Sequence, residues 1–149
     1  MLRLSRKTAL ALEAVLDVAF NARPNPVQSR DITERQGIPA RYLEQVLQQL
    51  VREGILKGVR GPRGGYTLAR ERRRVSLGEI VRVVSRMEAE DDDTASSAEL
   101  GEKVIGPIWR EAQETLLEKL DAVTMEDLCL EAQRQGIRRA GETTTDFTI

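Results

Sequence analysis

The stretch of sequence that decides the fold runs from residue 29 to residue 50 and reads SRDITERQGIPARYLEQVLQQL. Gly37 interrupts it, and Pro39 suits the first turn of a second helix because the missing N–H of proline would have no partner there. We therefore expect one helix over residues 29–36 and another from Pro39 until Gly54 ends it. The few residues between them match the spacing of a helix-turn-helix unit.

The second of these helices has two faces of opposite character. Its apolar stripe, which we expect to be buried, consists of Leu43, Val46, Leu47 and Leu50. The opposite face offers groups that bond to base edges and phosphates, and it contains the candidate base-reading residues Arg41, Tyr42, Glu44, Gln45 and Gln48. An ordinary solvated helix surface has the same kinds of residue, so this face alone does not decide between the two interpretations.

Two short strands are expected next, over residues 55–60 and 66–70, with the Gly-rich turn GPRGG at residues 61–65 between them. A hairpin in this place is the wing of a winged helix-turn-helix domain, and it favours DNA as the ligand. Arg60 and Arg63 lie at its tip, where arginine suits phosphates or a narrow minor groove. We reject a nucleotide-binding loop, because no Gly-Lys-Ser/Thr ending follows and the turn joins two strands.

The flanking patterns set the expected domain boundaries. A helix over residues 8–22 comes first, and the Ser-x-x-Glu spacing at residues 76–79 is a capping box that opens a fourth helix. We assign residues 1–86 to the winged helix-turn-helix DNA-binding domain. Residues 87–102 are strongly acidic and are predicted to form a flexible loop, and residues 134–149 a frayed tail.

A long helix is expected from residue 103 to about residue 123, followed by a short helix up to residue 133. At 1.5 Å per residue it would measure about 30 Å, more than the first domain needs to cover its own core. We therefore predict a mainly α (α+β) fold in which part of this helix pairs with a second copy of the chain. The candidate dimerisation residues are Ile105, Ile108, Trp109, Ala112 and Leu116.

The charge of the chain is divided between its two parts. Residues 1–86 contain 17 Lys and Arg against 8 Asp and Glu, a net charge of +9, whereas residues 87–149 contain 6 against 16, a net charge of −10. A basic amino-terminal part indicates a polyanionic partner, and double-stranded DNA is the leading candidate. Single-stranded nucleic acid is disfavoured, because 3% aromatic residues leave few surfaces for base stacking.

The composition of the 149 residues argues against several classes of function. There is no histidine and only one cysteine, which excludes intramolecular disulfides, Cys/His zinc sites and catalysis with an imidazole base. We predict no catalytic residues, no metal site and no cofactor. No apolar run approaches the roughly 20 residues of a membrane span, and no signal-peptide stretch follows the first residues, so we expect a cytoplasmic protein without a membrane partner.

The single cysteine, Cys129, has two interpretations. It lies on the apolar side of the last short helix, where a buried thiol is usually inert. A redox sensor would need an exposed thiol with a cationic neighbour, whereas the nearby charged residues are Glu126, Asp127 and Glu131. The inert interpretation is therefore favoured.

Several segments in order resemble the Rrf-type (IscR/CymR-like) winged-helix transcriptional regulators. They are LSRK at residues 4–7, DITERQGI at 31–38, YLEQ at 42–45, VRGP with GGY at 59–66, and SLGE at 76–79. The resemblance spans roughly residues 1–125. It implies a homodimeric bacterial transcription factor whose long helix crosses that of its partner.

The resemblance also implies roles for individual residues. Tyr42, Glu44 and Gln45 match the DNA-reading positions of the family, and Arg60 matches its wing position; Arg41 stands where relatives can have a small polar residue. Contacts to DNA phosphates, which set the register without reading bases, are assigned to Ser5, Arg6, Lys7, Gln28 and Ser29.

One departure from the family concerns the iron-sulfur cluster that some relatives bind. In an ungapped match, Asp91, Ser97 and Lys103 stand at the positions of the three cysteine ligands, and Gly106 stands where some relatives have a histidine. None of these side chains supplies a thiolate or an imidazole, so we expect no cluster of the ordinary kind.

The sequence thus predicts a homodimeric repressor that binds a partly palindromic DNA operator with two reading helices about 34 Å apart. An effector protein of the O-acetylserine lyase type or a small metabolite is a candidate signal by resemblance to the cluster-free relatives. Two alternatives remain open: a redox sensor that uses Cys129 or an atypical cluster, and a protein-interaction module that binds a partner in place of DNA.

Overall fold

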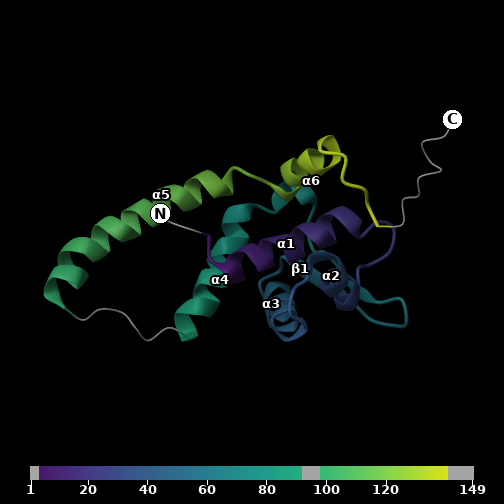
Figure 1. Ribbon diagram of the computed structural model, residues 1–149, viewed down its shortest axis with the longest axis horizontal. Coiled ribbons are helices and arrows are strands. Elements are labelled where there is room, and N and C mark those ends of the chain that lie inside the picture. Colours follow the sequence, from purple (N-terminus) through teal and green to yellow (C-terminus); the bar gives the residue numbers. More distant parts are fainter. Residues whose placement is uncertain (1–3, 92–97, 141–149) are drawn as a thin grey trace.

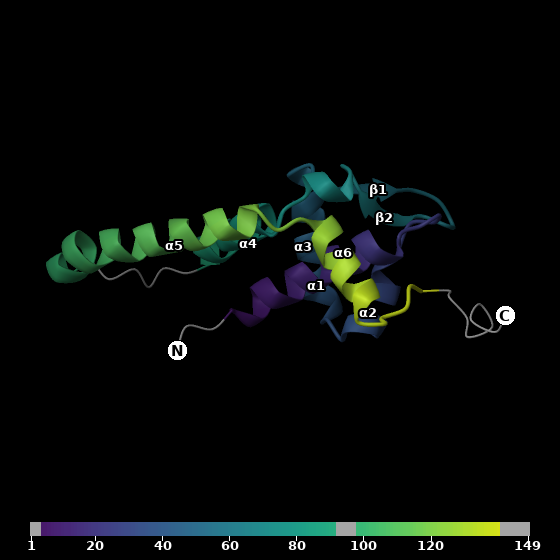
Figure 2. The same cartoon turned by 90° about the horizontal axis from the view of Figure 1, so that it is seen from above.

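The protein is described by a computed structural model in which residues 4–91 and 98–140 are placed. A compact body of helices with a small sheet occupies one end, and one long helix extends away from it (Figure 1). The view from above shows the same division into a body and a projecting arm (Figure 2). The predicted mainly α fold with a two-stranded wing is confirmed. Within the described residues, no helix is both long and apolar enough to cross a membrane.

Helix α1, Arg6–Asn21, lies at the centre of the body (Figure 1). Ser5 caps its start, because the Ser5 Oγ accepts a hydrogen bond of 3.1 Å from the Thr8 backbone N–H. Its small and branched side chains, among them Ala11, Val15 and Val18, are buried where other helices pack against it. The helix begins two residues before the expected start at residue 8.

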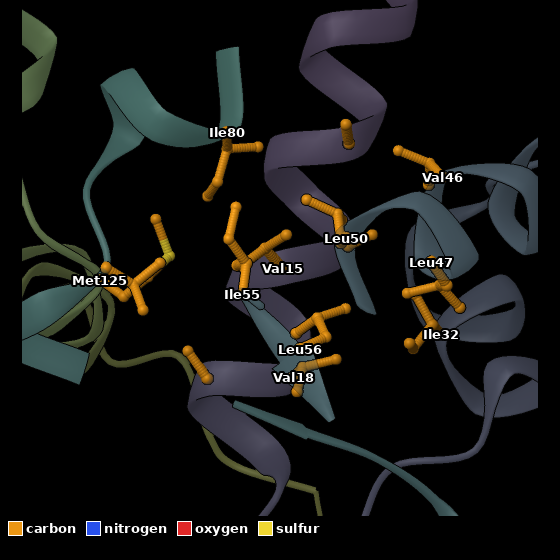
Figure 3. Packing of buried hydrophobic residues seen from close by; sticks show 14 of the residues in the cluster. Val15, Val18, Ile32, Val46, Leu47, Leu50, Ile55, Leu56, Ile80 and Met125 are labelled. Atoms are coloured by element: carbon orange, nitrogen blue, oxygen red, sulfur yellow. The ribbon is translucent and has the colours of Figure 1, made fainter. Parts of the chain in front are cut away.

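Helices α2, Ser29–Gln36, and α3, Ala40–Arg52, form the predicted helix-turn-helix. Gly37 has a φ of 66° at the end of α2, a left-handed conformation that glycine adopts without strain. The whole predicted apolar stripe of α3 is buried, namely Leu43, Val46, Leu47 and Leu50. Figure 3 shows Leu50 and Leu47 of this stripe pointing into the same cluster as Val15 and Val18 of α1.

Strands β1, Leu56–Val59, and β2, Gly65–Leu68, pair antiparallel as the predicted wing, with Leu56 opposite Leu68 and Val59 opposite Gly65. The turn-side end of β2 is tied to the connection between α1 and α2. Val27 and Tyr66 exchange backbone hydrogen bonds of 3.0 and 2.7 Å. No local sequence pattern indicates this bridge, because it joins a single residue to the hairpin.

Helix α4, Leu77–Asp91, follows a short 3-10 turn, η1, at Arg72–Arg74. The predicted capping box is present: the Glu79 N–H donates to Ser76 Oγ over 3.2 Å, and the Ser76 N–H donates to Glu79 Oε2 over 3.1 Å. The loop that was expected over residues 87–102 is shorter in the structure. Helix α4 continues to Asp91, and a π-helical segment, η2, begins at Leu100. Residues 92–97 lie outside the described residues.

The predicted long helix is built from η2, Leu100–Ile105, and α5, Gly106–Asp121. It runs beside α4 and then past the edge of the body (Figures 1 and 2). No side chain of α5 is buried, although its sequence carries an apolar stripe. The helix therefore presents apolar surface to solvent in a single chain.

Helix α6, Met125–Arg134, returns to the body, which corrects its assignment to a separate segment over residues 103–133. Met125 and Cys129 are buried with the winged-helix core, and Figure 3 shows Met125 beside Ile55 and Ile80. The Met125 N–H donates to the Val75 carbonyl over 2.8 Å. The winged-helix core therefore includes residues far beyond residue 86.

The segment after α6 also differs from the frayed tail that was expected from residue 134. Arg139 donates from Nε to the Phe20 carbonyl over 3.0 Å and from Nη2 to the Arg23 carbonyl over 2.9 Å. The Ala140 N–H donates to Asn21 Oδ1 over 2.7 Å. Hydrogen bonds to the end of α1 therefore hold the chain up to residue 140; residues 141–149 lie outside the described residues.

Candidate nucleic-acid interface

The outer face of α3 carries four of the five predicted base-reading side chains in an accessible position. They are exposed to solvent, and none of them forms a side-chain hydrogen bond or an ion pair with residues 4–91 or 98–140: Arg41, Glu44, Gln45 and Gln48. The buried stripe on the other side of the helix fixes their direction away from the core. Their donors and acceptors are therefore available to an external ligand.

Tyr42 differs from the other four. It is half-buried, and its hydroxyl donates a hydrogen bond of 2.5 Å to the Lys7 carbonyl. Burial, and to a lesser extent the negative charge of Glu88, raises the pKa of Tyr42 to about 12, so the hydroxyl stays protonated and can donate. The hydroxyl proton of Tyr42 is donated within the chain to the Lys7 carbonyl, and this hydrogen bond joins the start of α1 to α3.

The predicted phosphate contacts at the start of α1 are exposed beside this bond. Arg6 and Lys7 point into solvent in the first turn. Ser5 is already engaged, because its oxygen caps the helix and its proton is shared between Thr8 Oγ1 at 2.8 Å and Glu88 Oε1 at 3.1 Å. The exposed cations, rather than the serine hydroxyl, are the free groups at this end of α1.

The two predicted contacts before α2 are half-buried. Gln28 is the residue preceding the helix, and its side-chain oxygen accepts a hydrogen bond of 3.2 Å from Arg30 Nη2. Ser29 is the first helical residue. The backbone N–H groups at a helix start and the positive end of its dipole favour an anion here.

The wing arginines, Arg60 and Arg63, are both exposed, and neither pairs with an acidic residue in the described part of the chain. In Figure 1 the turn of the wing and α3 both lie along the lower side of the body. Gly61, with a φ of 111°, permits the tight turn between the strands. The body therefore carries a polar, exposed helix face on α3 and exposed cations on the wing.

The predicted dimerisation residues form an exposed apolar row along η2 and α5. The exposed fractions are 63% for Ile105, 66% for Ile108, 46% for Trp109 and 57% for Leu116, and Ala112 is exposed as well. Such an exposed apolar row usually marks an interaction surface.

Sequence reasoning missed the contact that fixes this helix to the body. Arg82 of α4 pairs with Asp121, and it also donates from Nη2 to Glu114 Oε1 over 3.2 Å, both on α5. The hydrogen bond to Asp121 is the main reason why the pKa of Arg82 is raised. The partners lie more than thirty residues away along the chain, so no local pattern reveals them.

The residues at the positions of cluster ligands have other surroundings. Cys129 is a free thiol buried in the core at α6. Lys103 pairs with Glu99 over 3.1 Å, and Gly106 lies at the start of α5. Asp91 ends α4, and Ser97 lies outside the described residues. No group of three or more acidic, histidine or cysteine residues in the described ranges is arranged to hold a metal ion.

A helix-turn-helix with an exposed reading face, followed by a two-stranded wing, defines a winged helix-turn-helix protein of the DNA-binding class. Residues 4–131 match the family model described as "Rrf2: Iron-dependent Transcriptional regulator". The chain belongs to the Rrf2 family, as the sequence predicted.

Curated relatives and solved structures agree with this assignment. The HTH-type transcriptional regulator IscR of Klebsiella pneumoniae (strain 342) is 36% identical over 129 residues, which cover 85% of this chain and 79% of the relative. The T. potens IscR structure has a TM-score of 0.71 and 32% identity, covering 93% of this chain and 94% of that one. The structure of CymR, the global cysteine regulator of B. subtilis, has a TM-score of 0.66 and 27% identity, covering 88% and 98%.

The IscR relative is named as an HTH-type transcriptional regulator, and CymR is named as a global cysteine regulator. The chain is therefore a transcriptional regulator of the IscR and CymR type, and the expectation that it is not an enzyme is confirmed by its family.

Proposed function

We propose that the chain is a homodimeric repressor that binds a specific double-stranded DNA sequence through α3 and the wing, without an iron-sulfur cluster. The observation that carries the proposal is the outer face of α3, where Arg41, Glu44, Gln45 and Gln48 are exposed without intramolecular partners in the described residues. A helix of this kind fits the major groove, where each base pair offers a distinct set of donors and acceptors.

The chemistry of the four side chains assigns them separate tasks. Arg41 suits the two acceptors of guanine, and Glu44 suits the amino donor of cytosine. Gln45 and Gln48 each carry a donor and an acceptor, as adenine recognition requires. Tyr42 acts by position in this proposal, because its hydrogen bond to Lys7 holds the start of α1 against α3.

Contacts to the DNA backbone are assigned to the starts of α1 and α2 and to the wing. Arg6 and Lys7 approach phosphates beside α3, with Ser5 at the same turn, and Gln28 and Ser29 offer the start of α2. Arg60 and Arg63 approach the phosphates or the minor groove from the wing. These contacts set the register of α3 on the duplex.

The exposed apolar row on η2 and α5 supports the second half of the proposal, which is dimerisation. Two copies that bury the row from Ile105 to Leu116 remove apolar surface from water, which favours association. A two-fold dimer places its two α3 helices in successive major grooves about 34 Å apart. A partly palindromic operator follows from that symmetry.

Function without a cluster is supported by the chemistry of the chain. Iron-sulfur clusters are usually held by four ligands, mainly cysteine thiolates. The chain has one cysteine, and Cys129 is buried inside the core on α6. The signal is then an effector protein, of the O-acetylserine lyase type, or a small metabolite.

The test compares single variants on a duplex selected from bound genomic fragments and on a scrambled duplex, by fluorescence anisotropy over a range of salt. Gln45→Ala should cost about 1–3 kcal/mol on the selected duplex and little on the scrambled one. Arg6→Ala should weaken both duplexes equally and lower the salt slope by about 1. Gln133→Ala, an exposed glutamine on α6, is the matched control and should change neither.

Equal effects of Gln45→Ala and Arg6→Ala on the two duplexes would contradict base reading by α3. A wild-type chain with no salt-dependent affinity for either duplex would favour a protein-interaction module.

A further inference from the structure

A hollow of about 520 Å³ lies where the connection between α1 and α2 meets the chain after α6. In both views these segments meet at the end of the body opposite the free end of α5 (Figures 1 and 2). Its wall includes Asn21 and Asn25, the prolines at positions 24 and 26, and the Arg139–Ala140 segment. This volume is within the range of about 300–1,000 Å³ that is typical of small-molecule sites.

The charged side chains of the wall favour an anion. Three arginines, Arg23, Arg35 and Arg139, line the hollow against one carboxylate, Asp31. Arg23 is exposed, and its side chain has no hydrogen-bond or ion-pair partner in the described part of the chain. Guanidinium groups bind carboxylate and phosphate through paired donors in a fixed plane.

Arg35 is held rigidly at this wall. Its Nε and Nη2 atoms donate to the two oxygens of Asp17 over 2.9 and 2.7 Å, and the Asp17 side chain is fully buried. Gln36 adds a third hydrogen bond to the same carboxylate, of 2.8 Å. The Nη1 atom of Arg35 makes no hydrogen bond with the described residues. A donor fixed in place before binding loses little side-chain entropy when a ligand accepts from it.

The hollow is connected to the elements that contact DNA in the proposed function. Val27 lines it and also forms the backbone bridge to Tyr66 on strand β2 of the wing. Asp31 and Arg35 belong to α2, the helix that packs directly against α3. A ligand that moves this wall by a small amount therefore acts on both the wing and the helix-turn-helix.

We propose that this hollow binds a small anionic metabolite with carboxylate or phosphate groups, held by Arg23 and Arg35, and that its occupancy changes the affinity for DNA. The coupling to DNA rests on the proposed function, whereas the binding of the anion does not. A phosphate of the DNA backbone is the other source of the same chemistry, and the experiment separates the two.

Binding is measured on the full chain without DNA by amide NMR shifts during titration with inorganic phosphate and with citrate, at an ionic strength held constant with sodium chloride. We expect saturable shifts confined to residues around the hollow. Arg23→Gln should weaken the binding about tenfold, as the loss of one charge-assisted hydrogen bond predicts. Asp31→Asn should strengthen it, because it removes the only carboxylate of the wall. Arg134→Gln, on α6 outside the hollow, is the matched control and should leave it unchanged.

Shifts that do not saturate with either probe, or equal binding by the wild type and Arg23→Gln, would overturn the proposal. The coupling is measured as the duplex affinity with and without saturating citrate, and we expect a change of about fivefold or more. A DNA phosphate as the occupant would appear as a smaller salt slope for Arg23→Gln without any saturable binding of the free probes, and this result also overturns the proposal. Saturable citrate binding by a chain that ignores duplex DNA would leave the site intact and contradict the proposed function.

Discussion

Arg82 on α4 forms an ion pair with Asp121 at the last residue of α5, and this contact joins the winged-helix body to the projecting helix. Gly78, one turn before Arg82, gives Asp121 the space it needs: a Cβ atom at Gly78 would meet the Asp121 carboxylate and lie 2.9 Å from its backbone nitrogen. The angle between α4 and α5 therefore depends in part on the close packing at this point. In the proposed dimer, that angle determines the distance between the two α3 helices.

Gly78→Ala tests the crowding directly. The added methyl group must displace Asp121, and we expect the free energy of unfolding to fall by about 1–3 kcal/mol. The measurement is denaturant unfolding followed by circular dichroism. Gly58→Ala is the control, because nothing lies within 4 Å of a Cβ atom there and its φ is not positive. Equal stability of Gly78→Ala and the wild type would show that α4 and α5 are not closely packed at this point.

Arg82→Ala is expected to change the geometry of the proposed dimer without preventing dimerisation. Because Arg82 is partly exposed, we expect little change in unfolding and an unchanged dimer in sedimentation. The affinity for a duplex with two correctly spaced half-sites should nevertheless fall, whereas that for a single half-site should not. Arg73→Ala, which removes an exposed ion pair with Glu71, should affect neither. A uniform loss on both duplexes would mean that Arg82 acts as a DNA contact and does not set the spacing.

The hydroxyl of Tyr42 gives a prediction for alkaline pH. Its ordinary pKa of 10.0 is raised to about 12, so the protonated form is favoured in the folded chain. The resulting stabilisation is fully present below about pH 10 and is lost as the pH rises towards 12. Ultraviolet absorbance of tyrosinate, taken as the difference between the wild type and Tyr42→Phe, should give a midpoint near 12. A midpoint at the ordinary value would show that the side chain of Tyr42 is exposed to solvent and not half-buried between α1 and α3.

Met125→Ala tests whether α6 belongs to the winged-helix core. Met125 is fully buried, and replacing it by alanine should cost about 2–5 kcal/mol in a single cooperative transition. Leu130→Ala is the control, because Leu130 lies in the same helix but is 57% exposed. Two separate transitions would restore the division at residue 86 that the sequence suggested.

Cys129 should resist alkylation in the folded chain, because only 1% of it is exposed. We expect a thiol reagent to label it only after denaturation, with the kinetics read by mass spectrometry. Rapid labelling of the native chain would reopen the redox-sensor alternative for this thiol.

Local patterns were sufficient to predict the helix-turn-helix and the wing. Gly37 marked the end of α2, and the stripe from Leu43 to Leu50 marked the buried face of α3, because both signals depend on neighbours within a few turns. The capping box of Ser76 and Glu79 was predicted for the same reason. The exposed side chains of α3 could then be located by their opposite position on the helix.

Contacts between distant residues could not be predicted in this way. The bond from Met125 to Val75 and the bonds from Arg139 to the end of α1 depend on how the chain returns to the body. Tyr42 was expected at the edge of the reading face; its half-buried side chain packs against the core and its hydroxyl donates to the Lys7 carbonyl. Such features are set by tertiary packing, which overrides what the local sequence suggests.

The central claim is that two α3 helices lie in DNA grooves, and a tethered cleavage reagent tests it most directly. Gln48→Cys places a reactive thiol on the outer face of α3, while the buried Cys129 of the unmodified chain serves as the blank. With iron–EDTA attached to this thiol, the account predicts two clusters of strand cleavage in the selected duplex, separated by about 10 base pairs. The same reagent on Gln133→Cys should give no such pattern, and cleavage by Gln48→Cys that is no stronger or more localised than this control would contradict the account.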